Sequence, residues 1–197
     1  MQTKEAKGTS TGGSVLNTRR IVTTGVLSAI AVMLGITRWG YIPVPNLSGS
    51  ATIMHIPAII GGVLEGPVVG GIIGLIFGLS SFLGDSSLYF KDPLVSVLPR
   101  IFIGIVAYFV YVGMRRVRVP LWLNLVITGI LGSATNTILV LAMIAVRFHV
   151  SVKALAVVAA TNGTAEAVLS AIVTSAVVLA YYGVAKPRRK SKISTVS

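Results

Sequence analysis

The sequence predicts an all-α integral membrane protein with six transmembrane helices and both termini in the cytoplasm. The first observation is composition: 54% of the 197 residues are hydrophobic and 11% are charged, whereas a soluble domain carries about 25% charged residues. The second is the mean hydropathy of +0.87. The third is the arrangement of the apolar residues, which form long stretches separated by short polar segments.

The apolar stretches are compared with the length that a membrane span needs, which is about 20 helical residues for about 30 Å of hydrocarbon. Six stretches are predicted to cross, over residues 21–37, 50–64, 67–83, 94–114, 119–146 and 155–185. The second is short, so we expect it to take in residues 47–50 or to lie obliquely. The whole chain divides into a polar tail over 1–18, a membrane domain over 19–186 and a basic tail over 187–197.

The second and third stretches form a predicted helical hairpin. Its turn, residues 64–67, combines Glu65, a glycine and a proline at a place where proline can begin a helix, and Glu65 is expected to be solvated. A stripe of glycines at spacing four then follows one helix face: Gly66, Gly70, Gly74 and Gly78. In water each would cost about 1 kcal/mol of helix propensity, whereas in lipid small residues let helices approach closely. We therefore expect this stripe at a helix–helix interface.

The basic residues set the predicted orientation, because Lys and Arg in short loops are retained in the cytoplasm. Most of the 17 lie before the first span, between the fourth and fifth, and after the sixth: Lys4, Lys7, Arg19, Arg20, Arg115, Arg116, Arg118, Lys186, Arg188, Arg189, Lys190 and Lys192. With six spans these three segments share one side, so both termini are predicted to be cytoplasmic. The net charge of +12 does not indicate nucleic-acid binding, since no aromatic-interleaved surface accompanies it.

The sequence contains no pattern that predicts catalysis. It has no cysteine, which removes thiolate metal sites and cysteine nucleophiles. Walker A and His-Glu-x-x-His patterns are also absent. We expect no enzyme activity, no metal, no cofactor and no ATP hydrolysis by this chain alone. Directional transport would then require partner subunits.

Two of the predicted outer loops carry polar and aromatic residues suited to cover a pocket. The first holds Arg38, Trp39, Tyr41 and Asn46 among prolines, and it cannot be helical throughout. The second holds Tyr89. For Trp39 the alternative is an anchor at the membrane interface.

Few polar residues fall inside the predicted spans. A charge at the bilayer centre costs about 2.5–3.5 kcal/mol, so each needs a partner or a water-filled cavity. Arg100 lies near the outer end of the fourth span, Asn136 inside the fifth, and Asn162 and Glu166 on one face of the sixth. These side chains suit a ligand with carboxylate, hydroxyl and amide groups. The alternative is structural: Arg100 pairs with Glu166 and the asparagines bridge helices, while His55 is a satisfied helix-end histidine.

Four segments are distinctive when taken together: residues 55–67 continuing to Ser81, residues 98–101, residues 132–137, and Asn162 with Glu166. They resemble the substrate-binding S components of energy-coupling factor (ECF) vitamin transporters, and the resemblance covers residues 19–185. It implies a six-helix protein of the prokaryotic plasma membrane that captures a vitamin outside. It also implies association with a transmembrane coupling protein and two cytoplasmic ATPases.

The same resemblance implies that the first three helices dock on the coupling protein. Many family members carry Ala-x-x-x-Ala in the first helix, and here the nearest patterns are Gly25-x-x-x-Ala29 and Ala31-x-x-x-Gly35. Which of the two pairs faces the coupling protein is left open. The glycine stripe from Gly66 to Gly78 is assigned to the same docking surface.

Pantothenate is the favoured vitamin because it is small, aliphatic, hydroxylated and anionic, and because the motifs most resemble the pantothenate and general subgroup. Arg38 or Arg100 would bind its carboxylate. Flat ligands would favour more stacking aromatics than these loops offer. The expected substrate-binding residues are Arg38, Trp39, Tyr41, Asn46, Tyr89, Arg100, Asn136, Asn162 and Glu166. The alternatives are cobalamin, pyridoxine, folate or riboflavin in the same role, a small intramembrane enzyme, or a membrane scaffold subunit without substrate.

Overall fold

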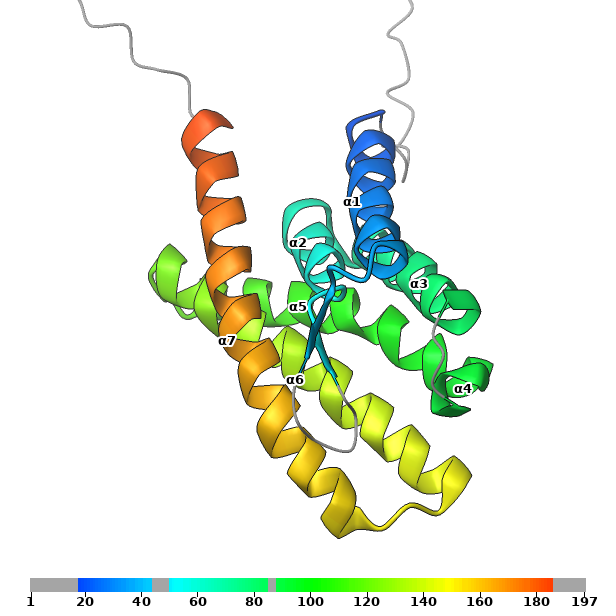
Figure 1. Ribbon diagram of the computed structural model, residues 1–197. Coiled ribbons are helices and arrows are strands. Elements are labelled where there is room, and N and C mark those ends of the chain that lie inside the picture. Colours follow the sequence, from blue (N-terminus) through cyan, green and yellow to red (C-terminus); the bar gives the residue numbers. More distant parts are fainter. Residues whose placement is uncertain (1–17, 44–49, 85–87, 186–197) are drawn as a thin grey trace, which may run out of the picture.

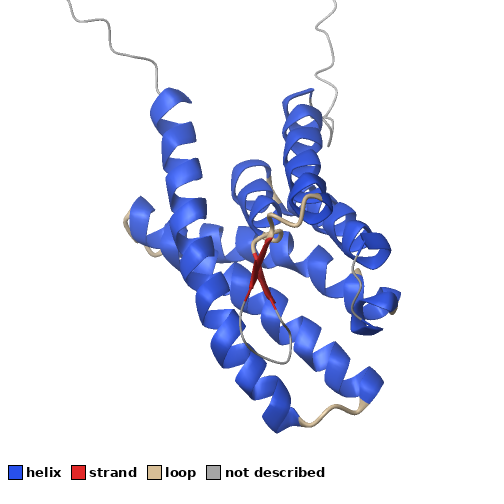
Figure 2. Cartoon of the chain, in the orientation of Figure 1, coloured by secondary structure: helices blue, strands red, loops and turns tan. Residues whose placement is uncertain are grey.

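The computed structural model describes residues 18–43, 50–84 and 88–185. This part of the chain is a helical bundle with one β-hairpin between its first two helices (Figure 1). The elements are α1 (Thr18–Ile36), β1 (Tyr41–Pro43), β2 (Ser50–Thr52), α2 (Ile56–Glu65), α3 (Pro67–Gly84), η1 (Leu88–Lys91), α4 (Pro93–Ser96), α5 (Leu98–Arg116), α6 (Leu121–Phe148) and α7 (Val152–Ala185). The all-α prediction is confirmed except for the hairpin, which Figure 2 shows in red.

The predicted spans correspond to long helices and to the short α2. Among the described residues, five helical segments are long and apolar enough to cross a membrane: Thr18–Ile36, Pro67–Gly84, Pro93–Arg116, Leu121–Phe148 and Val152–Val184. They match the predicted first, third, fourth, fifth and sixth stretches. The remaining helix, α2, has 10 residues, which at 1.5 Å per residue span only about 15 Å. Five of the six predicted stretches therefore match long apolar helices, and the second, which was expected to be short, matches α2.

The start of the second predicted stretch is wrong, and a proline explains why. Residues 50–52 form β2 instead of a helix, and α2 begins at Ile56 with Pro57 in its first turn. Proline is tolerated in the first turn but breaks a helix interior, where a helix beginning at residue 50 would have placed it. The fourth span is interrupted at Val97 in the same way, because Pro99 stands in the first turn of α5.

The short α2 lies at the centre of the bundle. It contacts α1, α3, α5, α6 and α7, and residues 56–63 are all buried. Non-helical backbone is tolerated at membrane depth where protein surrounds it. The surrounding helices therefore explain how the segment 50–55 can enter the bundle and place β2 against α7.

The glycine stripe packs against the protein's own α5 and α2. A Cβ atom at Gly70 would lie 2.8 Å from the Cα atom of Gly62, and one at Gly74 would overlap the carbonyl oxygen of Arg100. The predicted helix–helix interface is therefore confirmed, with α5 as the main neighbour.

The assignment of the stripe to a partner surface is corrected by this packing. Gly70, Gly74 and Gly78 are buried within the chain, so their face is already occupied. Gly66 lies at the α2–α3 turn with a φ of +105°, a conformation that favours glycine. The stripe thus serves the fold of this chain.

The α2–α3 turn folds onto the start of α1. The Glu65 side chain is 7% exposed; it accepts a 2.8 Å hydrogen bond from Nε of Arg19, and its Oε2 lies 4.0 Å from Nε of Arg20. The expectation of a solvated Glu65 is wrong, because α3 returns beside α1 and brings the turn to the basic residues that begin the first span.

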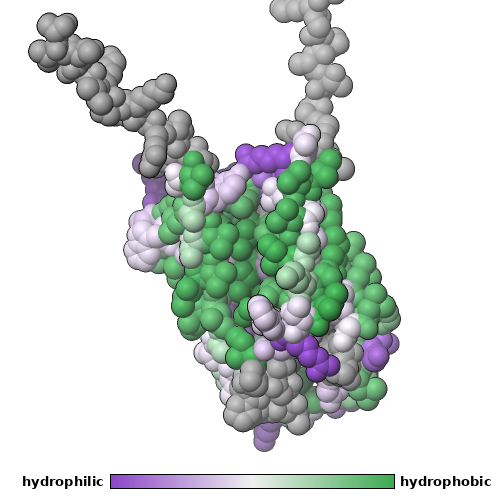
Figure 3. All heavy atoms as spheres, turned by 45° about the horizontal axis from the view of Figure 1, so that its top comes forward, coloured by the Kyte–Doolittle hydropathy of each residue, from purple (hydrophilic) through white to green (hydrophobic). Residues whose placement is uncertain are grey.

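The start of α1 and the end of α7 lie at the same end of the molecule (Figure 1). Apolar side chains cover the flank of the bundle, and hydrophilic ones gather toward its two ends (Figure 3). This distribution is the one expected of a protein whose middle lies in hydrocarbon.

Candidate functional site

A ladder of polar residues follows one face of α7. Asn162, Glu166, Ser170 and Thr174 stand four apart, and all four are buried, with exposures from 0% to 6%. Residues at spacing four share a helix face. Such residues inside an apolar bundle need partners or a ligand, so this face is the starting point of the candidate site.

Glu166 joins three parts of the chain. Its Oε1 accepts a 2.7 Å hydrogen bond from the backbone N–H of Thr52 in β2, and its Oε2 accepts one of 3.3 Å from the hydroxyl of Thr137 in α6. The ion pairs between described residues do not include one from Glu166 to Arg100. The hydrogen bonds of Glu166 thus go to Thr52 and Thr137, and the structural pairing with Arg100 is not seen as an ion pair within 4.0 Å among the described residues.

His55 provides a second link one helical turn further along α7. Its ring is fully buried, and its Nε2 and the Ser170 hydroxyl form a hydrogen bond of 2.7 Å. The expectation of a helix-end histidine with a partner is confirmed. The segment that leads into α2 is thus fixed to α7 at Thr52 and at His55.

Arg100 is buried beside two aromatic rings. Arg100 is only 4% exposed, and Nη1 of its guanidinium donates a hydrogen bond to the carbonyl oxygen of Val95. Its guanidinium carbon lies 4.8 Å from the centroid of the Phe90 ring and 5.7 Å from that of Phe77. Cation–π contacts of this kind hold a guanidinium in one orientation. The arginine is therefore positioned before any ligand arrives.

Two polar side chains of α6 are buried without hydrogen-bond partners among the described residues. They are Asn136, through its Oδ1, and Ser133, through its hydroxyl. The two residues stand three apart and so lie on neighbouring positions of one helix face. Since buried polar atoms nearly always have partners, these two atoms are candidate contacts for a polar ligand.

Two of the other expected site residues lie on the surface, whereas Tyr89 packs, like Phe90, against the apolar cluster that contains Val95. Arg38 is exposed just after α1, and Trp39 is 81% exposed, which favours the interfacial role for Trp39. Tyr89 stacks edge-to-face on Phe148 at 5.2 Å. Asn46 lies outside the described residues.

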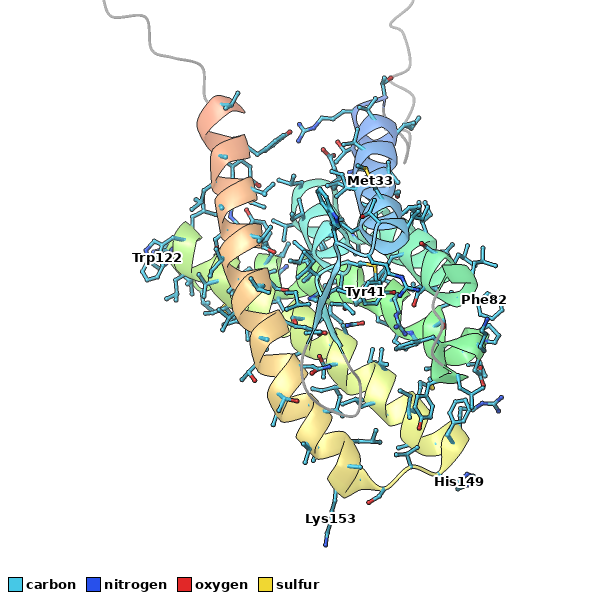
Figure 4. The ribbon with its side chains drawn as sticks, in the orientation of Figure 1. Met33, Tyr41, Phe82, Trp122, His149 and Lys153 are labelled. Carbon is cyan, nitrogen blue, oxygen red and sulfur yellow. The ribbon has the colours of Figure 1, made fainter. Side chains whose placement is uncertain are left out.

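Tyr41 takes an intermediate position. It is partly buried and packs on the core cluster that contains Met54 and Phe77. Figure 4 places it near the middle of the bundle, whereas His149 and Lys153 lie at the far end of α6 and α7. Tyr41 therefore remains close to the ring that contacts Arg100.

Several residues of the cluster were not predicted from the sequence. Their common property is that each contacts a residue of another element: Thr52, Phe77 and Ser170. Only Ser170 had a sequence signal, because it continues the spacing of Asn162 and Glu166.

The end of the bundle where α4 begins and α6 ends is held by an ion pair. Nε of Arg147, at the end of α6, donates to Oδ2 of Asp92 at 2.7 Å, and Oδ1 of Asp92 accepts from the backbone N–H of Leu94. Asp92 is thus the N-cap of α4. The hydrogen bond from Arg147 holds the pKa of the Asp92 carboxyl below its usual value, and the backbone bond from Leu94 acts in the same direction.

The structure separates the two small-residue pairs of α1. A Cβ atom at Gly25 would meet no neighbouring atom, and Ala29 is exposed. In contrast, Ala31 is fully buried, and a Cβ atom at Gly35 would lie 3.2 Å from the Met54 sulfur. Of the two pairs, Gly25 and Ala29 lie on the open side of the helix.

Comparisons with known proteins agree with this architecture. The family model described as ECF transporter, substrate-specific component, matches residues 19–180. A curated relative, the pantothenic acid transporter PanT of Lactococcus lactis subsp. cremoris (strain MG1363), is 31% identical over 153 residues, covering 64% of this chain and 75% of the relative.

Proposed function

The chain belongs to the family of ECF transporter substrate-specific components, and we propose that it captures a small anionic vitamin, with pantothenate favoured, among the buried polar residues of α2, α5, α6 and α7. Members of this family are multi-pass membrane proteins that act as transport subunits and not as enzymes, and they work with an energy-coupling module.

The observation that carries this proposal is the set of buried polar groups around Arg100, Asn136 and Ser133. Arg100 offers a positioned guanidinium for a carboxylate. Asn136 and Ser133 offer atoms without partners among the described residues, suited to hydroxyl and amide groups. A scaffold subunit would have no reason to retain such unsatisfied atoms, because each costs about 1–3 kcal/mol when buried.

Pantothenate is favoured over a flat vitamin for two reasons. Phe77 and Phe90 already contact the Arg100 guanidinium, so these rings are not open stacking surfaces. The named relative transports pantothenic acid according to its description. Riboflavin, folate, pyridoxine and cobalamin are the other candidates for the same site.

The test is binding of a vitamin panel to the purified full-length chain, read by thermal stabilisation. A ligand at about 1,000 times its Kd adds about 4.1 kcal/mol to stability, so we expect one large shift, with pantothenate. Asn136→Ala should reduce the shift, whereas Thr135→Ala should keep it, because the Thr135 hydroxyl donates to the Leu131 carbonyl of its own helix. A folded protein that responds to no vitamin would contradict the proposal.

Docking on the coupling protein, which acts with two ATPases, is assigned to the open face of α1. The apolar residues Val22, Val26, Ile30 and Met33 are exposed there, and Gly25 allows a partner helix to approach closely. We expect Gly25→Leu to bind the vitamin normally but to lose co-purification with the coupling module. Gly183→Leu is the matched control, since Gly183 on α7 is equally open.

The proposed topology has six crossings, with the hairpin and α2 together forming the second, and both termini in the cytoplasm. The basic residues at the start of α1 support this side. Because the chain has no cysteine, single introduced thiols report cleanly on topology. Ser191→Cys should be protected from an impermeant reagent in intact cells, and Lys153→Cys should react.

A further inference from the structure

A cavity lies beside the turn between α2 and α3. It has a volume of about 360 Å³ and lies where α1 begins, between the α2–α3 turn and α5. Its polar lining consists of Arg19, Arg20, Glu65 and Tyr108, and its apolar lining comes from residues 63, 64, 67 and 68. The cavity is therefore charged on one wall and apolar on the other.

The described lining of this cavity contains two arginines and one carboxylate. The Glu65 side chain is 7% exposed, whereas those of Arg19 and Arg20 are 60% and 41% exposed. Part of the cationic surface at this cavity is therefore open to the surroundings of the chain.

We propose that this cavity binds the phosphate headgroup of an anionic phospholipid. Arginine suits phosphate oxygens through its planar set of donors. The arginines stand in the first turn of a membrane-spanning helix, which is the depth of lipid headgroups. The apolar wall includes Val68, which is 51% exposed, and this wall suits the start of an acyl chain better than a free inorganic anion.

Such a lipid would matter most for α1. Only 11% of the most apolar window of α1 is buried inside the protein, against 44% for α3. The contacts of Arg19 with Glu65 and with the ring of Tyr181, 5.6 Å away, join the start of this loosely packed helix to α2 and α7. A bound headgroup would hold Arg19 and Arg20 together at this junction and so stabilise the position of α1.

The test is lipid binding by the purified full chain, titrated in detergent with phosphatidylglycerol or with phosphatidylcholine and read by native mass spectrometry. We expect phosphatidylglycerol to be retained preferentially. Arg20→Gln should weaken its binding about five-fold, which corresponds to about 1 kcal/mol per basic residue near an anionic surface. Arg116→Gln, an equal change of charge at an exposed residue at the end of α5 and outside the cavity, should leave binding unchanged.

Glu65→Gln distinguishes a lipid site from a purely structural ion pair. Removing the only carboxylate of the cavity lining should strengthen phosphatidylglycerol binding even if the melting temperature falls. If Glu65→Gln and Arg20→Gln change only the melting temperature, the proposal is wrong. If millimolar inorganic phosphate raised the melting temperature as much as phosphatidylglycerol does, the proposal would also be overturned, since the site would then recognise a free anion.

Discussion

The α2–α3–α5 block and the α6–α7 pair differ in the polarity of their buried residues. In the block, glycines bring backbones into contact: Gly70 meets both Gly62 and Gly104. The α6–α7 contact has one such glycine, Gly129, but its buried residues include many polar side chains, and some of their atoms have no partner among the described residues. The difference underlies our proposal that one side of the bundle supplies rigidity and the other binds the ligand.

The largest test of this comparison is Gly74→Leu. The new side chain would overlap the carbonyl oxygen of Arg100, and overpacking of this kind typically costs about 1–3 kcal/mol, or more where backbones meet. We expect loss of folded protein, measured as yield of the monodisperse protein and its melting temperature. Gly25→Leu should fold normally, because its position is open. A stable Gly74→Leu variant would show that the block is not rigid.

A second test asks whether Arg100, which belongs to α5 of the block, takes part in binding the ligand. Arg100→Ala should weaken an anionic vitamin by about 2 kcal/mol or more, at least about thirty-fold in Kd, because a desolvated charge loses its partner. Isothermal titration calorimetry measures this directly. Arg38→Ala should have no effect, since Arg38 is exposed and apart from the cluster. If Arg38→Ala weakened binding and Arg100→Ala did not, the site for the ligand carboxylate would lie in the loop after α1.

A smaller effect is expected at Glu166, where the hairpin meets α7. Glu166→Ala leaves the Thr52 N–H without its acceptor, which should cost about 1–3 kcal/mol. Glu166→Gln retains an acceptor oxygen and should lose less. The melting temperatures of the two variants, compared without ligand, measure the difference. Equal losses would mean that the charge, and not the hydrogen bond to β2, holds the hairpin.

The smallest effect is expected at Asp92, which lies outside both regions. Its folded-state pKa is depressed by Arg147, so the pair stabilises the protein above the ordinary pKa of 3.8. This stability is lost as pH falls through the folded value. Wild-type melting temperature should therefore decline more steeply below about pH 4 than that of Asp92→Asn. Parallel curves would show that the ion pair contributes nothing measurable.

Much of the fold could be predicted from the sequence because hydropathy and helix length are local properties. The five long spans follow from apolar stretches. The breaks before α2 and α5 follow from Pro57 and Pro99. The length of the apolar stretches, used alone, predicted a continuous helix across each break. The β-hairpin was missed since pairing of Tyr41 with Thr52 joins residues across a loop.

The site was harder to predict because it depends on contacts between helices. Spacing alone put Asn162 and Glu166 on one buried face. It did not reveal whether Glu166 would meet Arg100 or Thr52, and the structure shows the latter. The glycine stripe illustrates the same limit: its spacing predicted close packing, but the neighbour proved to be α5 of the same chain.

The contact among Gly62, Gly70 and Gly104 has an evolutionary consequence. Any side chain at these positions would collide with backbone atoms, so saturation mutagenesis should find almost no tolerated replacement there. Yet the contact involves no group that recognises a ligand. Descendants of this protein are therefore free to change their preferred molecule by altering α6 and α7 while inheriting this glycine junction intact.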